Sequence, residues 1–287
     1  MYGFGIIGCG MISGFHARAI AALPNAELRS VQSRSEDNAR RVADEYGCEW
    51  TTDLDQMLGR DDIDVVTVCT PSGAHMEPVI AAAEARKHVI VEKPLDISLA
   101  RCDAMIEACA EAGVQLGGVF QSRFHETSAL IRETLDSGRF GRLTLADATV
   151  KWWRDQAYYD DGGWKGTQAL DGGGALMNQA IHAIDLIQWL MGPVSEIAAF
   201  TDTLAHERID VEDTAVACMR FENGALGVIE GATSVHPGFL KKLEISGNKG
   251  SIILQEEDLT CWQFADENAD DDRIREEIGE RTTTGGG

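Results

Sequence analysis

Apolar positions in the first part of the chain alternate between short runs typical of β-strands and longer stretches with helical spacing. The opening run over 2–8 is followed by glycines and then by Ile12, Phe15, Ala19 and Ile20, which recur as on one face of a helix. Further strands are predicted over 27–33, 65–70 and 88–92, and helices over 36–46, 76–85 and 99–112. Strands that alternate with helices predict a parallel sheet with right-handed crossovers, covered on both faces.

After about Phe120 the pattern changes to strand-like segments separated by turn signals such as Asn223-Gly224. The strands are predicted over 143–153, 197–203, 214–221, 225–232, 243–246 and 251–254. One long helix is predicted over 175–191, and the acidic, then Thr/Gly-rich stretch 265–287 is predicted to be a loop or a ragged end. We therefore expect an α/β protein: a doubly wound parallel sheet in a domain over 1–121, and an α+β domain with a mostly antiparallel sheet over 122–287.

Charge and composition narrow the class of protein. The 287 residues include 47 acidic and 25 basic side chains, a net charge of −22, so most of the surface would repel a nucleic acid. No apolar run approaches the ~18–20 residues of a membrane span, and the first residues lack the basic segment of a secretory signal. The seven cysteines are scattered, so we expect reduced thiols, no metal site and a cytoplasmic location. The acidity fits either colloidal repulsion or a saline habitat.

A glycine-rich turn, G-C-G-M-I-S at 8–13, separates the first predicted strand from the first predicted helix. A dinucleotide-binding fold needs a tight turn here, because the backbone approaches a pyrophosphate at the helix N-terminus. Ser13 stands where the third glycine of the fingerprint is usual. The position of this glycine-rich segment, between the first strand and the first helix, favours a dinucleotide site over a plain turn. The predicted binding residues are Gly8, Gly10, Met11 and Ile12.

The second strand lacks the acidic residue that usually binds the adenosine ribose hydroxyls at its end. Ser33 and Arg34 stand there instead. A hydroxyl and a guanidinium suit a 2′-phosphate, which favours NADP(H) over NAD(H). The alternative is that Arg34 lies on a solvated turn.

Two later strands end in further candidate residues, because ligands of open α/β sheets bind at the carboxyl ends of the strands. One loop carries Thr70, Pro71, Ser72 and His75. The next carries Glu92 and Lys93, where the following proline favours an extended backbone that holds the lysine over the crevice. The alternatives are that the first loop forms only a turn and that Glu92 and Lys93 are only a surface charge pair.

The predicted helix 175–191 carries a polar stripe on a largely apolar surface. Asn178, His182 and Asp185 are four and then three residues apart, so they share one face of an α-helix. Buried polar groups need partners, so the stripe indicates either a structural His–Asp hydrogen bond or a ligand site. Three glycines at 172–174 permit close approach of a ligand and favour the site. His182 suits proton exchange with a hydroxyl, with Asp185 orienting its other ring nitrogen.

Aromatic and cationic side chains cluster shortly before this helix. Aromatic faces with hydroxyl and cationic tips suit a sugar ring, although such clusters also occur in cores and interfaces. The cluster consists of Trp152, Trp153, Arg154, Tyr158, Tyr159, Trp164 and Lys165.

Together these motifs resemble the Gfo/Idh/MocA family of glucose-fructose oxidoreductases and inositol dehydrogenases. The resemblance extends from about Tyr2 to Phe264. It rests on the glycine turn, T-P-S at 70–72 with His75, E-K-P at 92–94, W-K-G-T at 164–167, D-G-G-G at 171–174, and N-Q at 178–179 with His182 and Asp185. It implies a Rossmann domain and an open-faced antiparallel sheet that joins subunits into a homodimer or homotetramer. It also implies hydride transfer between NAD(P) and a secondary hydroxyl or ketone of a sugar, cyclitol or nucleotide sugar.

The resemblance also implies roles for single residues. Lys93 matches the catalytic lysine and His182 the catalytic histidine, and both would contact substrate. Gln121, Trp164 and Lys165 match positions that often touch the cofactor, and Tyr158, Trp164 and Asn178 complete the expected substrate set. Asn178 stands where inositol dehydrogenases have an acidic residue, and Lys165 where arginine is usual. Family members continue for several tens of residues, so we expect an incomplete C-terminal part.

These observations predict an NAD(P)-dependent dehydrogenase. Two other classes remain as alternatives: a non-catalytic NAD(P)-binding regulator that senses redox state, and a purely structural or interaction protein. Lys93 and His182 favour the enzyme over the regulator, and the glycine turn disfavours a purely structural role.

Overall fold

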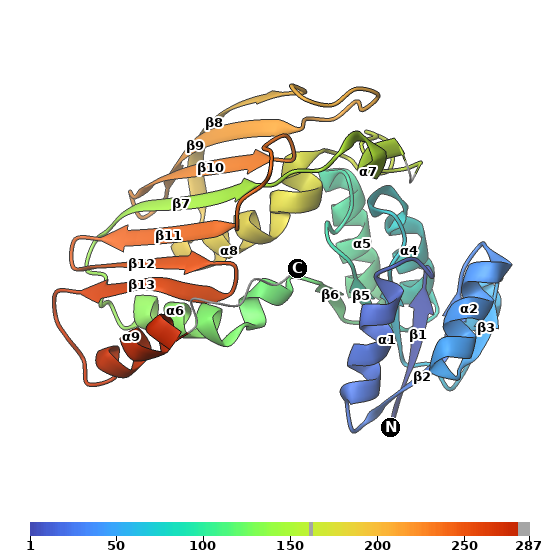
Figure 1. Cartoon of the computed structure of the whole chain (residues 1–287). Coiled ribbons are helices and arrows are strands. Elements are labelled where there is room, and N and C mark those ends of the chain that lie inside the picture. Colours follow the sequence, from blue (N-terminus) through green and yellow to red (C-terminus); the bar gives the residue numbers. More distant parts are fainter. Residues whose placement is uncertain (161–162, 281–287) are drawn as a thin grey trace. The chain divides into compact units, whose positions relative to one another are not determined.

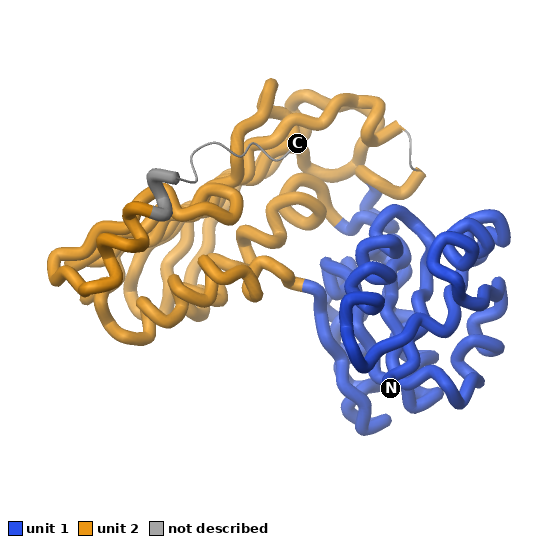
Figure 2. Tube along the Cα trace, turned by 60° about the horizontal axis from the view of Figure 1, so that its bottom comes forward, with its two compact units in different colours: residues 1–119, 167–172 blue, residues 120–166, 173–287 orange. Residues whose placement is uncertain are grey.

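The computed structural model describes residues 1–160 and 163–280, which group into two compact units (Figure 2). Unit 1 comprises 1–119 and 167–172, and unit 2 comprises 120–166 and the residues from 173 onward. Thr167–Gly172 belongs to unit 1, where the backbone N–H of Gly73 donates to the carbonyl of Leu170 at 2.8 Å. The chain therefore passes between the units more than once, whereas the sequence suggested one boundary.

Unit 1 is a six-stranded parallel sheet in the order β3-β2-β1-β4-β5-β6 (Figure 1). Its strands are β1 (Tyr2–Ile7), β2 (Ala26–Gln32), β3 (Glu49–Thr51), β4 (Val65–Val68), β5 (His88–Val91) and β6 (Leu116–Gly118). Its helices are α1 (Ser13–Ala22), α2 (Glu36–Tyr46), α3 (Leu54–Leu58), α4 (Met76–Glu84) and α5 (Leu99–Ala112), with a 3₁₀ turn over Ser72–Ala74. The strand order reverses beside β1, as in the doubly wound dinucleotide-binding fold, which confirms the prediction for this region.

Both faces of this sheet are buried because successive side chains of a strand point to opposite sides. Ile6 packs with residues of α1 and α2, including Ala17 and Val42. Ile7 packs on the other side with residues of α4 and α5, including Val79. This double burial explains the short apolar runs of β1, β4 and β5.

Unit 2 is a seven-stranded sheet in the order β13-β12-β11-β7-β10-β9-β8, in which β7 and β10 are parallel and the other pairs antiparallel. Its strands are β7 (Leu143–Lys151), β8 (Val194–Asp202), β9 (Thr214–Phe221), β10 (Leu226–Ala232), β11 (Lys242–Gly247), β12 (Gly250–Gln255) and β13 (Asp258–Phe264). Its helices are α6 (Glu126–Asp136), α7 (Gln156–Asp160), α8 (Ile181–Met191) and α9 (Asp271–Glu280), with a 3₁₀ turn over Gln121–Phe124. The mostly antiparallel sheet is as predicted.

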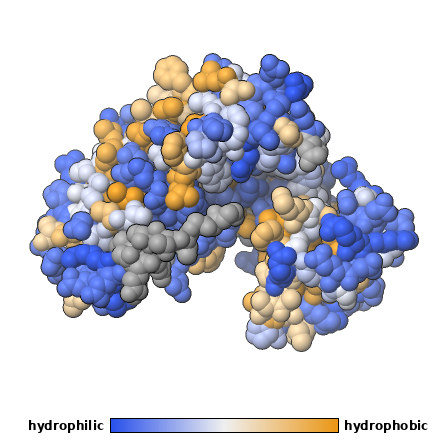
Figure 3. Space-filling view, in the orientation of Figure 1, coloured by the Kyte–Doolittle hydropathy of each residue, from blue (hydrophilic) through white to orange (hydrophobic). Residues whose placement is uncertain are grey.

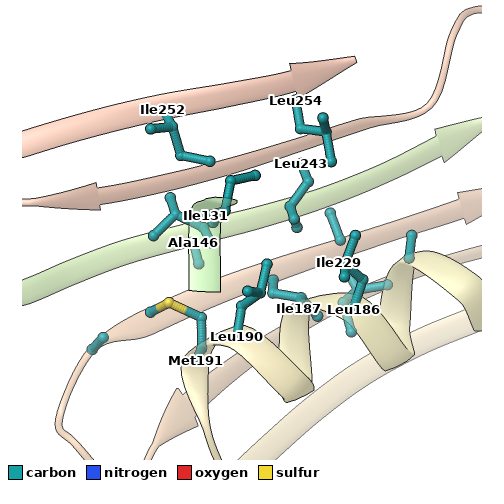
Figure 4. Close-up of a cluster of buried hydrophobic side chains, with 14 of the residues drawn as sticks. Ile131, Ala146, Leu186, Ile187, Leu190, Met191, Ile229, Leu243, Ile252 and Leu254 are labelled. Carbon is teal, nitrogen blue, oxygen red and sulfur yellow. The ribbon is translucent and has the colours of Figure 1, made fainter. Parts of the chain in front are cut away.

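One face of this sheet carries the core of unit 2. Ile187 and Leu190 of α8 pack against inward side chains of the strands, such as Leu243 and Ile252 (Figure 4). Ile131 of α6 and Ile274 of α9 belong to the same buried cluster. This face holds α8, and therefore His182, in a fixed position against β7 and β11.

The opposite side chains of the same strands are largely exposed. Along β9, buried residues alternate with exposed Val216, Cys218 and Arg220. Phe200 of β8 lies opposite Val216 and is 88 % exposed. Figure 3 shows apolar side chains mixed with polar ones on unit 2. The open face implied by the family resemblance is therefore present.

Two predictions along the chain were wrong in part. The stretch expected to be a loop contains α9, whose Asp271 accepts hydrogen bonds from the backbone N–H of Asn268 and the indole of Trp262. Residues 281–287 of that stretch lie outside the described residues. The expected helix over 175–191 begins as a π-helix over Ala175–Ala180 and becomes α-helical at Ile181. No helix within the described ranges is long and apolar enough to cross a membrane.

Candidate functional site

The glycine turn lies between the end of β1 and the start of α1. Gly8 has φ +96°, and a Cβ there would lie 2.8 Å from the backbone carbonyl carbon and oxygen of Cys69. A side chain at Gly8 is therefore disfavoured for two reasons: the positive φ, and the lack of room beside the backbone of Cys69. A Cβ at Gly10 would meet nothing within 4 Å, so this part of the turn is open.

The start of α1 suits an anion. Ile12 at the N-cap position offers no capping side chain, and the first turn contains no acidic residue. Met11 is 86 % exposed, and Ser13 turns its hydroxyl back to the carbonyl of Gly10 at 2.6 Å. Backbone N–H groups at a helix start bind phosphate groups. These features fit the pyrophosphate of a dinucleotide.

The end of β2 lies beside the same turn, where the backbone N–H of Gly8 donates to the carbonyl of Gln32 at 2.8 Å. Ser33 is buried and its Oγ accepts a hydrogen bond from the backbone N–H of Ser35, whereas Arg34 is exposed. Arg41 of α2 donates from Nη2 to the carbonyl of Cys9 at 3.1 Å. Arg41 thus brings a cation to the glycine turn. Arg41 was not predicted, because no local spacing connects a residue inside the predicted helix 36–46 with the glycine turn.

The loop after β4 is held to the loop after β5 by His75. This ring is 1 % exposed, with Nε2 at 2.9 Å from the carbonyl of Thr70 and Nδ1 at 3.0 Å from that of Pro94. Thr70 and Pro71 are half-buried and Ser72 is buried. We therefore assign His75 to shaping the loop, because its ring is enclosed by protein. Contacts of Thr70, Pro71 and Ser72 with a cofactor stay a prediction.

Lys93 and Glu92 follow β5 in a charged, partly buried setting. Burial lowers the pKa of Lys93 from its ordinary value, although the charges of Glu92 and the buried Asp171 act in the opposite direction. Burial alone would raise the pKa of Glu92, but hydrogen bonds from His16, at 2.9 Å, and from the backbone N–H of Lys93 hold it below its usual value. The net effect is that the pKa of Lys93 lies below its ordinary value.

In unit 2, Glu212 holds the start of the π-helix. Its two carboxylate oxygens accept from the backbone N–H groups of Gly174 and Leu176, both at 2.9 Å. A Cβ on Gly174 would lie only 1.7 Å from the carbonyl oxygen of Glu212. The three glycines at 172–174 were expected to permit close approach of a ligand. At Gly174 the close neighbour is the protein's own backbone.

Asp185 has a partner that the sequence analysis did not anticipate. Both of its carboxylate oxygens accept from the guanidinium of Arg123, with the Nε–Oδ2 distance at 2.8 Å. Asp185 is 9 % exposed, and Arg123 lies in the 3₁₀ turn that also carries Gln121. A bidentate pair fixes orientation as well as charge. It ties α8, and with it His182, to the first residues of unit 2.

Two of the predicted substrate residues, Tyr158 and Asn178, meet at Gln179. Its Nε2 donates to Tyr158 Oη at 2.9 Å and to Asn178 Oδ1 at 3.0 Å, and its Oε1 accepts from Arg154 at 3.1 Å. The ammonium of Lys165 lies 3.9 Å from the centre of the Tyr158 ring. A ring, two cations and two amides thus form one polar cluster, as a polyhydroxylated ligand requires. Trp164 is half-buried and Gln121 exposed, and their contacts with ligand stay a prediction.

The strand order, the glycine turn and the uncapped helix start define a dinucleotide-binding protein of the doubly wound class. A family model described as an oxidoreductase family with an NAD-binding Rossmann fold matches residues 2–119, and one of the GFO/IDH/MocA C-terminal domain matches 129–253. The chain belongs to the GFO/IDH/MocA oxidoreductase family, which confirms the resemblance read from its motifs.

Similar proteins of this family include named dehydrogenases. The myo-inositol 2-dehydrogenase of Thermotoga maritima is 33% identical over 276 residues, which cover 93% of this chain and 79% of that protein. The levoglucosan dehydrogenase of Pseudarthrobacter phenanthrenivorans is 30% identical over 302 residues, covering 93% and 77%. The solved WlbA dehydrogenase from Bordetella pertussis, in complex with NADH and UDP-GlcNAcA, is 37% identical with a TM-score of 0.92, covering 97% and 82%.

Proposed function

We propose that this chain is an NAD(P)-dependent oxidoreductase that transfers hydride between a nicotinamide and a secondary hydroxyl or ketone of a sugar, cyclitol or nucleotide sugar. The observation that carries the proposal is the position and burial of Lys93. This lysine follows a parallel strand at its carboxyl end, and burial lowers the pKa of its ammonium group. Ligands bind at this edge of open α/β sheets, and an ionisable group works best as an acid or base when its pKa lies near the working pH.

The nicotinamide supplies the hydride acceptor or donor. The open turn at Gly10 and the uncapped start of α1 bind the pyrophosphate, and Arg41 adds positive charge there. Lys93 polarises the reacting oxygen, and His182 takes the hydroxyl proton on oxidation and returns it on reduction. Asp185 is a positioning residue in this scheme, because Arg123 holds both of its oxygens.

The polar cluster around Gln179 supports a carbohydrate-like substrate. Arg154 and Lys165 lie over the Tyr158 ring, 5.3 Å and 3.9 Å from its centre. Together with the nearby amide of Asn178 they offer hydrogen-bond donors and an acceptor. Two of the relatives above are named for inositol and levoglucosan, and the WlbA structure contains UDP-GlcNAcA. These ligands share adjacent hydroxyls on a ring, which defines the proposed substrate class.

The cofactor preference rests on the residues after β2. Arg34 is exposed and no acidic residue competes at that point of the strand end, so we propose NADP(H) over NAD(H). The WlbA structure contains NADH, so the two cofactors must be compared directly on this chain.

Assembly and location follow as further proposals. The open face of the second sheet suits a homodimer or homotetramer, because exposed apolar side chains lie on it. The cytoplasmic location expected from the sequence fits the seven cysteines, all within the described residues and all free thiols.

Turnover with and without Lys93 tests the proposal. The purified chain should reduce NAD⁺ or NADP⁺ with at least one member of a panel of cyclitols, sugars and nucleotide sugars. Lys93→Met should lower kcat by about 10³-fold or more while cofactor affinity stays within about tenfold, because the oxygen loses its polarising group. Lys249→Met is the matched control, since Lys249 pairs with Asp266 on the surface of unit 2.

Retained turnover in Lys93→Met would remove the assigned role. Cofactor binding without any turnover would favour the regulator.

A further inference from the structure

The connection between β8 and β9, residues 203–213, holds both parts of the polar cluster around Gln179. Its Glu212 accepts two backbone N–H groups at the start of the π-helix that carries Gln179. On the other side, Gln156 of α7 donates from Nε2 to the carbonyl of Glu207 at 2.6 Å, and the backbone N–H of Glu207 donates to Gln156 Oε1 at 2.9 Å. The β8–β9 connection therefore contacts both segments that supply the cluster.

The same connection packs against the backbone beside Lys165. The backbone N–H of Asp210 donates to the carbonyl of Gly166 at 2.9 Å. Gly166 has φ +74°, and a Cβ there would lie 2.6 Å from the side chain of Ile209. Only a glycine fits this close approach without strain. The position of Lys165 in the chain is thereby tied to the β8–β9 connection.

His206 is the residue of this connection that reaches Arg154. Its Nε2 lies 2.8 Å from the carbonyl oxygen of Arg154, and its Nδ1 lies 2.9 Å from Oδ2 of Asp213. The side chains of His206 and Asp213 are 2 % and 0 % exposed, so bulk water does not compete for either contact. Histidine suits this bridge, because its two ring nitrogens can present N–H groups in two directions.

Asp213 is itself held from several sides. Its carboxylate accepts from the backbone N–H groups of Leu204 and Ala205, at 2.9 Å and 2.8 Å, and from the hydroxyl of Thr214. Burial alone would raise the pKa of Asp213, but these hydrogen bonds and the one from His206 hold it below its usual value. A carboxylate fixed in this way sets the orientation of the imidazole.

Arg154 connects this pair with the polar cluster. Its Nη2 donates to Gln179 Oε1 at 3.1 Å, and its guanidinium lies 5.3 Å from the centre of the Tyr158 ring. The backbone N–H of the same residue donates to the carbonyl of Thr233 at 2.9 Å, while its own carbonyl meets His206. The main chain of Arg154 is thus held on both sides, and its side chain extends from a fixed position.

We propose that His206, oriented by Asp213, is a positioning residue that fixes Arg154 for contact with the substrate. The proposal rests on the proposed function, because Arg154 belongs to the cluster assigned there to a carbohydrate-like ligand. Ordering a long side chain on binding costs conformational entropy, so a guanidinium that is already fixed binds hydroxyls more tightly. His206 is buried, so its effect on the substrate passes through Arg154. Loss of the contact should weaken substrate binding more than it slows the chemical step.

Two substitutions separate the two contacts of His206. His206→Asn keeps an amide N–H on the side of Asp213 and loses the contact with Arg154, whereas His206→Gln keeps an N–H on the side of Arg154. His206→Ala removes both contacts without adding a polar group, and it replaces His206→Asn should that variant not fold. Arg208→Gln is the control, because Arg208 lies in the same connection, is 59 % exposed and pairs with Asp160 at the surface.

Crystal structures of the variants provide a readout that does not depend on turnover. The contact between Arg154 Nη2 and Gln179 Oε1 should be lost in His206→Asn and kept in His206→Gln and Arg208→Gln. With a substrate from the panel above, His206→Asn should raise KM by about tenfold with kcat within about threefold, and His206→Gln should restore most of that loss. The affinity for NADH should stay the same in all variants.

An unchanged contact between Arg154 and Gln179 in folded His206→Asn or His206→Ala would overturn the proposal. So would a fall in kcat at an unchanged KM, because the substitution would then act on the chemical step. Absence of turnover on every member of the panel would instead count against the proposed function alone, since the contact between Arg154 and Gln179 is measured in the crystal structures.

Discussion

Lys93 shows how one side chain is set between opposing effects. Burial disfavours its ammonium form, and the nearby carboxylates of Glu92 and Asp171 favour it. His16 in turn binds Glu92, so part of that carboxylate's charge is directed away from the lysine. Asp171 is buried, and its negative charge raises the pKa of Lys93. Removing this charge is therefore a direct way to change that pKa.

Replacing Asp171 should move the Lys93 titration downward. Asp171→Asn removes a charge that raises the lysine pKa, so burial would lower it further. If Lys93 must be protonated to polarise the substrate oxygen, the fall of kcat at high pH should begin at a lower pH in the variant. The pH profile of kcat measures this shift. Asp62→Asn, which removes a surface carboxylate paired with Arg60, is the control and should leave the profile in place. A profile that moves to higher pH would contradict this electrostatic account.

Single positions differed in how far the sequence revealed them. Lys93, Thr70 and Gly8 could be singled out as candidates because strand ends and the first βα turn are fixed by chain order. The partners of these residues were not found. Arg123 and Asp185 are 62 positions apart, and Arg41 meets Cys9 from another helix. Such pairs depend on tertiary packing, which no local spacing encodes.

The helix α9 depends on the residue at its beginning. Arg139 binds both carboxylate oxygens of Asp271 and holds the pKa of this carboxyl well below its usual range, against the effect of burial. The indole N–H of Trp262 in β13 donates to the same carboxylate at 2.8 Å. Asp271 is thereby a junction between α9, β13 and the loop after α6.

Asp271 should contribute stability that acid removes. Because its pKa is lower in the folded chain than in the unfolded one, its contribution is complete above the unfolded value near ~3.9 and declines as pH falls toward the folded value. Asp271→Asn should lower the free energy of unfolding by about 2–3 kcal/mol at neutral pH, with a smaller difference below about pH 4. Denaturant unfolding at several pH values measures this. Asp272→Asn, whose side chain is 85% exposed, should have little effect. A deficit that does not depend on pH would contradict the assignment.

At the scale of elements, the sequence predicted what periodicity controls. The central strands of the first sheet and the strands β7 to β12 of the second sheet followed from their patterns, whereas β13 was not predicted. β3 and β6 were missed because three residues are too few to show a period. The π-helix over Ala175–Ala180 was missed because apolar spacing does not separate it from an α-helix. Glu212, which accepts two backbone hydrogen bonds at the start of this π-helix, lies beyond the helix in the chain.

At the scale of the molecule, the open face of the second sheet is the surface to explain. Phe200, Val216, Leu226 and Leu145 are between 44 % and 88 % exposed on neighbouring strands of that face. Exposed apolar side chains in adjacent positions mark interaction sites. The homodimer or homotetramer proposed above would bury this face against a second copy of the chain.

A charge on that face should dissociate the assembly. We expect Phe200→Asp to convert a dimer or tetramer into monomers, because an aspartate would be buried without a partner in the interface. Ile197→Asp is the matched control: Ile197 is on the same strand, is 65 % exposed, and pairs with Met219 on the helix-covered side. Size-exclusion chromatography with light scattering gives the mass. A monomeric unaltered chain, or dissociation by Ile197→Asp alone, would contradict the assignment.

The most direct test of the account is binding of the cofactor itself. Nicotinamide fluorescence should report saturable binding of NADPH and weaker binding of NADH to the purified chain. In Arg34→Ala the affinity for NADPH should fall by about tenfold, with NADH little changed, because only NADPH offers the guanidinium a phosphate. Tighter binding of NADH would reverse the cofactor preference and leave the enzyme class intact. A well-folded chain that binds neither nucleotide would contradict the central claim that this is a nicotinamide-dependent oxidoreductase.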